Sequence, residues 1–234
     1  AHPKPAGKLE PSSQTGKSSQ RGGTLIGPKY EITETVHPFY PWLHRIRALR
    51  DFRKGARAGA WGGFIQSEKN LSQEGDCWVF DNSIVAENAM VSENAIVRNG
   101  SFVCGSAVIS GKAEINSLSI VRDRATVIDA YVTGGSYVAG DGKLLPNDFT
   151  HEAPILWGQD SVYGELNGKI YVDNGVVILP GKAVANPTLD LLWFYPKGIQ
   201  IHREFREKSR GKGRVFSPYQ KPISQAKERS SLER

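Results

Sequence analysis

Small and β-branched residues recur along the middle of the chain with a period of six residues. In nine consecutive units, a small residue is followed two positions later by Val or Ile. The units are Cys77/Val79, Ser83/Val85, Ala89/Val91, Ala95/Val97, Ser101/Val103, Ala107/Ile109, Ala113/Ile115, Ser119/Val121 and Ala125/Val127. The phase then slips by one residue to Ala130/Val132 and resumes at Ser136/Val138. Because side chains two positions apart in a strand share one face, this period predicts short strands joined by tight turns.

Three six-residue sides close a triangular coil, so residues 18 positions apart are expected to stack at the roughly 4.8 Å spacing of paired strands. The predicted inward columns are Cys77/Ala95/Ala113, Ser83/Ser101/Ser119, Ala89/Ala107/Ala125, Val79/Val97/Ile115, Val85/Val103/Val121 and Val91/Ile109/Val127. One column consists of serines, and a buried hydroxyl costs free energy unless it is hydrogen-bonded. We therefore predict a serine ladder whose members bond to one another or to the backbone.

The repeat resembles the left-handed parallel β-helix of the hexapeptide-repeat acyltransferase superfamily. The family pattern is an aliphatic residue, a small or acidic residue, two variable residues and a small residue. It is met by V-A-E-N-A from Val85, V-S-E-N-A from Val91 and V-C-G-S-A from Val103. The resemblance implies an all-β fold, a left-handed parallel β-helix with triangular coils. It implies little about chemistry, because one fold can carry many functions.

A second, narrower resemblance concerns the residues before the repeat. IRALRDF from Ile46 and GAWGGFIQSEKNLSQEGDCWVFDNS from Gly59 resemble the N-terminal cap of small, uncharacterised hexapeptide-repeat proteins of bacteria and phages. A cap is also expected on physical grounds, because the end of a β-helix is a ring of unpaired backbone groups. We expect the cap to use Trp61, Phe64 and Trp78 as apolar plugs.

The chain divides into five segments. Residues 1–23 and 202–234 are poor in large apolar residues, which predicts a disordered N-terminal tail and a basic, largely disordered C-terminal tail. Between them we place the N-terminal cap at 24–71, the β-helix at 72–142, and a loop with an irregular β C-terminal cap at 143–201. Strand-like stretches in the last segment can form another, irregular coil or a small sheet over the end of the helix.

The positive charge of the chain lies at its ends. The formal net charge is +6, from 30 Lys and Arg against 24 Asp and Glu. The tail at 202–234 contributes +6 and the tail at 1–23 contributes +3, which leaves −3 for the residues between them. Phe216 and Tyr219 lie among the basic residues and would permit non-specific nucleic-acid contact. This is the weakest functional reading, because the tails carry no folded nucleic-acid-reading motif.

The cap arginines could also bind phosphate or nucleic acid, but their alternation with apolar residues favours solvated charges on a half-exposed strand.

A polar loop after the repeat carries the candidate catalytic residues. Loops that leave a rigid scaffold often hold function, and residues 143–159 form such a loop. His151 is the candidate general base, with Asp148 and Glu152 as possible orienting groups. Acyltransferases of the superfamily that the repeat resembles use a histidine near the coil interface, with acetyl- or acyl-CoA in a groove between subunits. The loop matches no motif of that family, and a histidine in a polar loop is more often a surface residue.

Two functional readings from different classes follow. We favour a non-catalytic scaffold or interaction protein, in which a stiff β-helix presents flat faces to a protein partner or to copies of itself, with a homotrimer as one arrangement. This reading requires no cofactor. The alternative is a CoA-dependent acyltransferase that uses acetyl- or acyl-CoA, with His151 as its base. Tails of this composition would also suit a bacterial protein that is delivered into another cell.

Other sites receive less support from the sequence. No group of His, Cys, Asp and Glu has metal-ligand spacing, so no metal is predicted. Cys77 and Cys104 fall on different sides of the triangle, whereas a disulfide needs Cα atoms within about 7 Å, so free thiols and a reducing compartment are expected. No apolar run of about 18 residues would span a membrane, and the N-terminus lacks the apolar region of a secretory signal. We therefore expect the bacterial cytoplasm, with secretion or delivery as the alternative.

Overall fold

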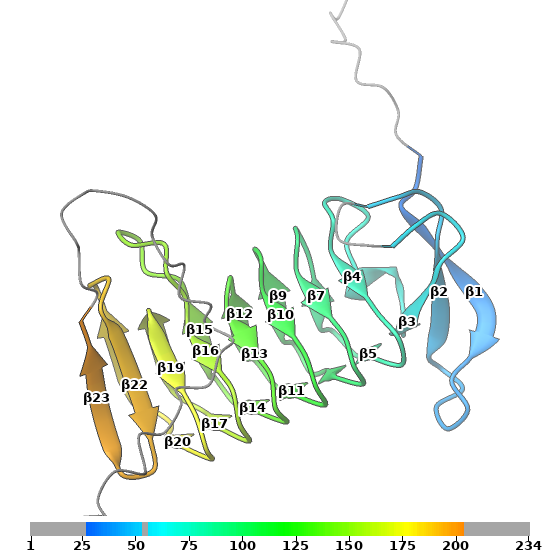
Figure 1. Ribbon diagram of the computed structural model, residues 1–234. Helices are drawn as coiled ribbons and strands as arrows, with labels where there is room; N and C mark the ends of the chain where they lie inside the picture. The colour runs from blue at the N-terminus through cyan, green and yellow to red at the C-terminus, as the bar shows by residue number, and fades with distance from the viewer. Residues whose placement is uncertain (1–26, 53–55, 204–234) are drawn as a thin grey trace, which may run out of the picture.

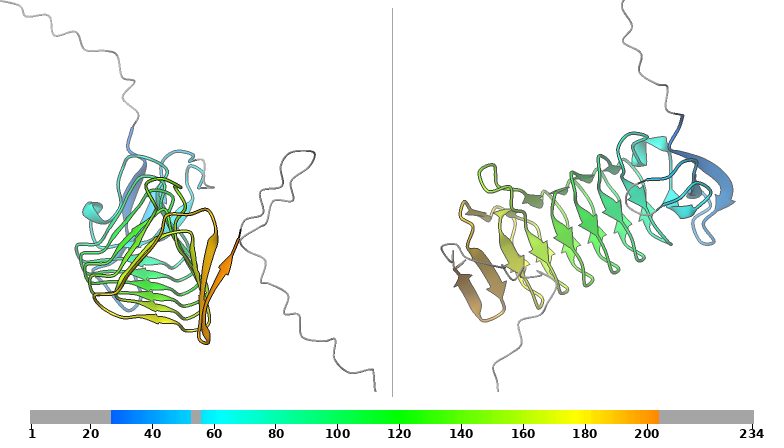
Figure 2. Two further views of the ribbon diagram at one scale, coloured as in Figure 1. Left: turned by 90° about the vertical axis from the view of Figure 1, so that its left-hand side faces the viewer. Right: turned by 45° about the horizontal axis from the view of Figure 1, so that its top comes forward.

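A computed structural model describes residues 27–52 and 56–203 of the chain. The strands stack into a three-sided parallel β-solenoid of about seven coils (Figure 1). The outline of the coils is triangular when the molecule is viewed from its end (Figure 2). The predicted fold class, an all-β parallel β-helix with triangular coils, is confirmed. The predicted N-terminal tail and almost all of the predicted basic C-terminal tail lie outside the described residues.

The three sides of the solenoid are three sheets, named here face A, face B and face C. Face A contains β1 (Tyr30–Val36), β2 (His44–Ala48), β3 (Trp61–Ile65), β5 (Ile84–Val85), β8 (Phe102–Val103), β11 (Ile120–Val121), β14 (Tyr137–Val138), β17 (Ser161–Val162) and β20 (Val177–Ile178). Face B contains β6 (Met90–Val91), β9 (Val108–Ser110), β12 (Thr126–Ile128), β15 (Lys143–Leu145), β18 (Glu165–Gly168) and β21 (Ala183–Asn186). Face C contains β4 (Trp78–Val79), β7 (Ile96–Val97), β10 (Glu114–Ile115), β13 (Tyr131–Val132), β16 (Ile155–Leu156), β19 (Ile170–Val172), β22 (Leu191–Tyr195) and β23 (Gly198–His202). A 3-10 helix, η1 (Glu68–Asn70), precedes the first coil.

The strand register confirms the predicted aliphatic columns. On face A, Val103 pairs with Val85 on one side and with Val121 on the other. The predicted columns of faces B and C pair in the same way. Every member of these three columns is fully buried, so the core is a stack of aliphatic side chains along the axis. Burial of each such side chain contributes about 1.5 to 3 kcal/mol.

The coils continue beyond Gly142, where the sequence analysis placed the end of the regular helix. The face A column extends from Val138 to Val162, which are 24 positions apart, and then to Ile178 after 16 positions. Its core members remain aliphatic and buried. The segment from 143 onward is therefore a set of irregular coils in parallel register with the earlier ones. The six-residue period is lost from the sequence because the corners change length. The inward aliphatic residues are retained.

Carboxylates and glycines alternate along the corner between faces A and B. Glu87, with a φ of 59°, accepts a hydrogen bond from the backbone N–H of Gly105 at 2.7 Å. Asp123, with a φ of 62°, accepts one from Gly140 at 3.0 Å. A Cβ at Gly105 would lie 2.6 Å from the backbone nitrogen of Asp123, so this corner has no room for a side chain there. Each carboxylate thus joins its coil to the next.

The prediction of a hydrogen-bonded serine ladder is wrong for its three regular members. The Oγ atoms of Ser83, Ser101 and Ser119 are buried and have no hydrogen-bond partner within residues 27–52 and 56–203. Stacked residues lie about 4.8 Å apart, too far for the roughly 2.7 Å of a bond between hydroxyls. The carbonyl three residues before each serine already accepts that serine's own backbone N–H, at 3.0 to 3.3 Å. Ser136 differs, because its Oγ donates to the Thr133 carbonyl at 2.7 Å.

The N-terminal end is covered by an antiparallel extension of face A. Strand β1 pairs with β2, and β2 pairs with β3, before β3 joins the parallel stack. The buried Trp78 of the first coil packs against Tyr30 and Phe52, with ring centroids 6.1 and 5.0 Å away. The fully buried Lys29 donates from Nζ to the Cys77 carbonyl at 2.9 Å. Because Cys77 precedes β4, the first strand of face C, this ammonium satisfies a carbonyl that no earlier coil can reach.

The three predicted plugs do not act together. Trp78 closes the end of the coil as expected, but Trp61 is 52% exposed and lies beside the Arg47 guanidinium, 5.9 Å from its ring centroid. Phe64 pairs in register with Ile84 on the outer side of face A, so it does not point into the end of the coil. Its burial comes from Leu43 and the His37 ring, which pack on it from the segment between β1 and β2. The sequence pattern named the apolar residues of the cap but could not distinguish its inner from its outer surface.

Candidate functional site

The predicted catalytic loop leaves face B after β15 and enters face C at β16. The side chain of Asn147 is buried and organises the loop. Its Oδ1 accepts hydrogen bonds from the backbone N–H of Phe149 at 3.0 Å and of Thr150 at 3.2 Å, and its Nδ2 donates to Asn167 at 2.9 Å. The N–H of His151 donates to the Asn147 carbonyl at 2.8 Å. These bonds give the loop a defined shape.

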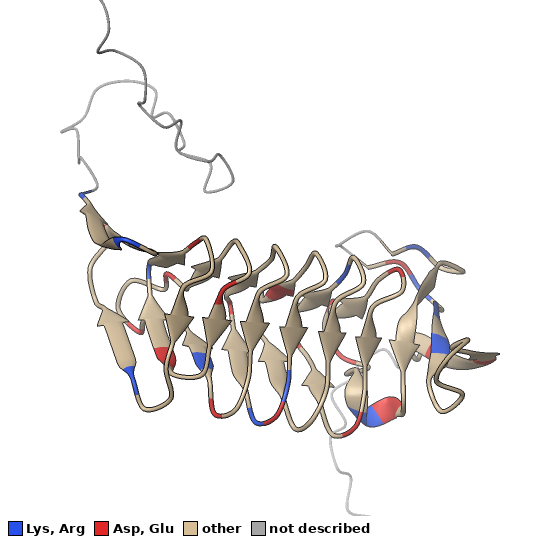
Figure 3. Cartoon of the chain, turned by 90° about the horizontal axis from the view of Figure 1, so that it is seen from below, with Lys and Arg blue, Asp and Glu red and all other residues tan. Residues whose placement is uncertain are grey.

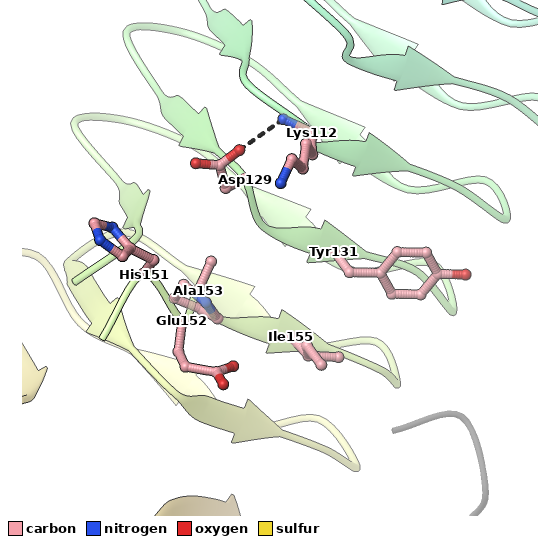
Figure 4. Close-up of a pocket in the computed structure, with 8 residues that line it drawn as sticks. Lys112, Asp129, Tyr131, His151, Glu152, Ala153 and Ile155 are labelled. Carbon is pink, nitrogen blue, oxygen red and sulfur yellow. Dashed lines mark hydrogen bonds between the residues drawn. The ribbon is translucent and has the colours of Figure 1, made fainter. Parts of the chain in front are cut away.

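His151, Asp148 and Glu152 lie in one loop but do not form a catalytic pair in this structure. His151 is exposed and has a left-handed backbone with a φ of 56°. Within the described chain, no hydrogen bond or ion pair joins its imidazole to Asp148 or to Glu152. Figure 4 shows the imidazole and the Glu152 carboxylate pointing in different directions. The Glu152 carboxylate instead lies 3.8 Å from the Lys169 ammonium. Catalysis by His151 stays a prediction.

A pocket of about 460 Å³ lies at the corner between faces B and C, next to this loop (Figure 4). Its lining consists of Lys112, Asp129, Tyr131, His151, Glu152, Ala153, Pro154 and Ile155. Asp129 accepts the backbone N–H of Lys112 at 2.7 Å, so part of its hydrogen-bonding capacity is already used. A charged, phosphate-bearing cofactor would find the Lys112 ammonium here, but two carboxylates lie beside it. The pocket can hold a small polar molecule more easily than a polyphosphate.

Face A presents a second candidate site, a flat surface of mainly apolar side chains. The outward residues at the centres of successive strands are Ile84, Phe102, Ile120, Tyr137, Ser161 and Val177. Figure 3 views this face directly. It shows no Lys, Arg, Asp or Glu on the face A strands β5, β8, β11, β14, β17 and β20. Ile84 and Phe102 also contact the buried group formed by Leu43, Phe64, Ala86 and Cys104. The apolar surface is thus continuous at the N-terminal end of the face, whereas farther along the Arg122 guanidinium reaches Tyr137.

The other two faces carry charged pairs on their strands. On face B, Lys143 and Glu165 pair in register, with Nζ and Oε2 3.7 Å apart. Near face C, the Arg98 guanidinium lies 3.1 Å from the Glu114 carboxylate. Charged pairs keep a sheet surface hydrated, whereas uncharged apolar rows favour contact with another surface. Face A is therefore the distinctive outer surface of the solenoid.

The outward ladder of face A was missed by sequence reasoning, although its signal was present. The 18-residue spacing that predicts the inward columns applies equally to the outward residues. Sorting them in the same way places Ile84, Phe102 and Ile120 in one column. The comparable column of face B reads Met90, Val108 and Thr126, followed by Lys143. The contrast between the two columns could have been read directly from the chain.

Metal, membrane and thiol chemistry add little to these sites. In residues 27–52 and 56–203, no three His, Cys, Asp or Glu side chains are grouped so that they could hold a metal ion. The same residues contain no helix that is long and apolar enough to cross a membrane. Cys77 and Cys104 are both buried free thiols, and burial raises the pKa of each. Buried thiols of raised pKa are poor nucleophiles.

The proposed nucleic-acid contacts fall on Phe216 and Tyr219, which lie outside the described residues. Strand β2 places two of the cap arginines, and the contacts of these two are local. Arg47 binds Glu31 at 2.6 Å, and Arg45 donates from Nε to the Gly62 carbonyl at 3.1 Å.

No family model matches the chain, and no curated protein matches it.

Proposed function

We propose that this protein is a non-catalytic scaffold whose face A binds a second copy of the chain. The observation that supports the proposal is the outward ladder of Ile84, Phe102, Ile120 and Tyr137 on strands that carry no charge. A contiguous apolar surface on a folded protein is typical of an interaction site. Because the strands below are fixed by a fully buried core, the ladder is ordered before binding and loses little conformational entropy on contact.

A second copy fits face A better than a partner of one charge sign. The corner beside the ladder carries acidic and basic groups in alternation, as the Arg122–Asp123 and Arg124–Asp141 ion pairs show. A surface with both signs along one edge can complement itself when two copies are related by a two-fold axis. A strongly acidic or strongly basic partner would leave half of these groups facing like charge.

The experiment compares two substitutions in one coil. Ile120→Glu places a carboxylate at the centre of face A, and Thr126→Glu places one at the matching outward position of face B, so Thr126→Glu is the control. Sedimentation velocity over a concentration series should show association of the wild type and of Thr126→Glu, and a monomer for Ile120→Glu. A wild type that stays monomeric at every concentration would exclude the proposal.

The pocket beside His151 favours a second candidate function, CoA-dependent acyl transfer. In that function His151 would accept the proton of an acceptor hydroxyl or amine, and the pocket of about 460 Å³ would hold the acceptor. The test is a titration of the full chain with acetyl-CoA, followed by transfer assays of His151→Ala. His202→Ala, an exposed histidine on β23, is the control. Absence of acetyl-CoA binding, or equal transfer rates in the two variants, would remove this candidate.

A further inference from the structure

The segment between β1 and β2 forms an aromatic ridge, defined here as Phe39, Tyr40 and Trp42. The segment is a closed turn, because the N–H of His37 donates to the Leu43 carbonyl at 2.8 Å. The His37 ring stacks on Tyr40 with centroids 5.1 Å apart, and Tyr40 lies 5.5 Å from Trp42. Prolines on either side of the Phe39-Tyr40 pair restrict the backbone further. The ridge is thus a rigid element.

The aromatic ridge stands on the outer surface of face A, at its N-terminal end. Phe64 points outward in register with Ile84, yet only 4% of its surface is exposed. The His37 ring covers it edge-on at 4.8 Å, and Leu43 packs beside it. The ridge therefore rises above the flat ladder that begins at Ile84.

The ridge itself is exposed to an unusual degree for aromatic residues. The exposed fraction is 82% for Phe39, 56% for Trp42 and 44% for Tyr40. Aromatic residues, Trp and Tyr above all, are the side chains that most often supply the binding energy of protein interfaces. The loop holds three aromatic side chains in contact with water. Transfer of these side chains from water into an interface with a partner would lower the free energy.

The opposite end of face A is also apolar. Val177 on β20, the last strand of this face, is 53% exposed, and Leu179 directly after it is 56% exposed. Seven parallel strands from β3 to β20 separate this end from the ridge by about 29 Å at the usual spacing of about 4.8 Å. One end of the face is thus raised and aromatic, and the other is low and aliphatic.

We infer that two copies pack face A against face A in antiparallel orientation, so that the aromatic ridge of each copy covers Val177 and Leu179 of the other. This inference rests on the proposed self-association and adds its geometry. In a parallel arrangement, which includes a homotrimer about an axis along the coils, the ridges would meet each other and hold the flat ladders apart. In the antiparallel arrangement, each ridge lies over the low end of the other copy and both ladders come into contact.

The size of the face supports a role for the ridge. A strip about 29 Å long along the axis and roughly 15 Å across it, the length of four to five extended residues, offers on the order of 450 Å² of flat surface. A stable interface buries about 800 Å² on each partner, so the ladder alone is too small. Two ridge contacts, one at each end of the paired faces, enlarge the interface toward that size.

Cysteine cross-linking distinguishes the two orientations. Phe39→Cys and Leu179→Cys are made separately in a Cys104→Ala background, because Cys104 is the native thiol on this face. Each variant is treated with a short bismaleimide, alone and as an equimolar mixture, and the linked peptides are identified by mass spectrometry. Thr126→Cys on face B is the control for random collision. Both cysteines replace exposed side chains, so the fold is retained.

The inference expects a link between residues 39 and 179 in the mixture and few links in either variant alone. Strong 39–39 links together with 179–179 links would overturn it while leaving self-association intact. A monomer without links in any sample would overturn the proposed function as well.

A substitution in the ridge gives an independent readout. Trp42→Ala should weaken the dimer at least about tenfold, as expected for an aromatic anchor. Trp61→Ala, which removes another half-exposed tryptophan of the cap, should leave the dissociation constant unchanged. Equal effects of the two substitutions would show that the ridge is not a specific contact.

Discussion

The coils before Gly142 and the coils after it share one core but differ at their corners. Between Val79 and Val138, the paired inward residues are 17 or 18 positions apart, as for Val103 with Val121. After Val138, the steps range from 16 positions between Val162 and Ile178 to 24 between Val138 and Val162. The inward residues are nevertheless buried and in register in both regions. A parallel solenoid is therefore defined by its inward columns, and its corners can change length without breaking the ladder, because surface insertions add little closure entropy.

The two regions also differ in how their polar groups are satisfied. Within the described residues, the Ser83, Ser101 and Ser119 hydroxyls have no partner, whereas Ser136, the last serine of the column and the one that stacks on the irregular region, donates to the Thr133 carbonyl. Asp160 follows Ser136 in that column and is fully buried. Its carboxylate accepts four backbone hydrogen bonds at 3.0 to 3.2 Å, from residues 157, 158, 175 and 176. Irregular corners thus bring backbone N–H groups to a buried acid.

The largest expected effect tests whether the two regions are one cooperative unit. Ile109 and Leu166 belong to the same inward column of face B, and both are fully buried. Substitution of either by Ala should lower the free energy of unfolding by about 2 to 5 kcal/mol, because each leaves a cavity in the core. Urea unfolding followed by circular dichroism measures this. A single transition that shifts equally in both variants is expected, and a separate early transition in Leu166→Ala alone would divide the solenoid into two units.

A smaller effect separates the crowded corners from the open ones. Gly105→Ala should cost about 2 to 3 kcal/mol, since a Cβ there would lie 2.6 Å from the Asp123 nitrogen and the φ of 72° is left-handed. Gly181 has nearly the same φ, 73°, but no atom in the described part of the chain lies within 4 Å of the position that a Cβ would take there. Gly181→Ala should therefore cost only the backbone term, about 1 kcal/mol. Equal melting temperatures for the two variants would contradict the crowding argument.

Two members of the serine column, Ser119 and Ser136, are expected to respond to substitution with opposite signs. Ser119→Ala removes a buried hydroxyl without a partner and should stabilise the protein by up to about 1 kcal/mol. Ser136→Ala removes the hydrogen bond to the Thr133 carbonyl and should destabilise it by about 1 kcal/mol. Thermal melts of both variants, measured side by side, provide the comparison. A loss of stability in Ser119→Ala would show that its hydroxyl is hydrogen-bonded in solution.

The smallest expected effect is a dependence of stability on pH. Burial raises the pKa of Asp160 above its ordinary value, and the four backbone donors oppose this only in part. A carboxyl whose pKa is higher in the folded state stabilises the fold below the unfolded value of about 3.9 and loses this contribution as the pH rises through the folded value. Asp160→Asn should remove that slope from the unfolding free energy measured above about pH 4. The control Asp148→Asn, an exposed carboxyl, should retain it. An unchanged slope in Asp160→Asn would assign it to another group.

Sequence and structure agree most closely where the chain is most regular. The columns through Val103, Ile109 and Ile115 could be predicted residue by residue, because stacking requires only the spacing of small and β-branched residues. The candidate site was less predictable. The loop of His151 could be recognised from its composition, but the direction of the imidazole depends on the Asn147 contacts that shape the loop. The role of Phe64 depends on a loop that folds over it from a distant part of the chain.

The sequence by itself determined the inward face of the solenoid. A side chain that must fit a narrow, dry core at a fixed spacing is restricted to a few residue types, and this restriction leaves a visible period. The tertiary structure alone decided where the coils end, which hydroxyls of the serine column find partners, and how the aromatic ridge lies on face A. These features depend on distances between residues far apart in the chain, and the outward and corner positions involved are under no packing restriction that would produce a repeat.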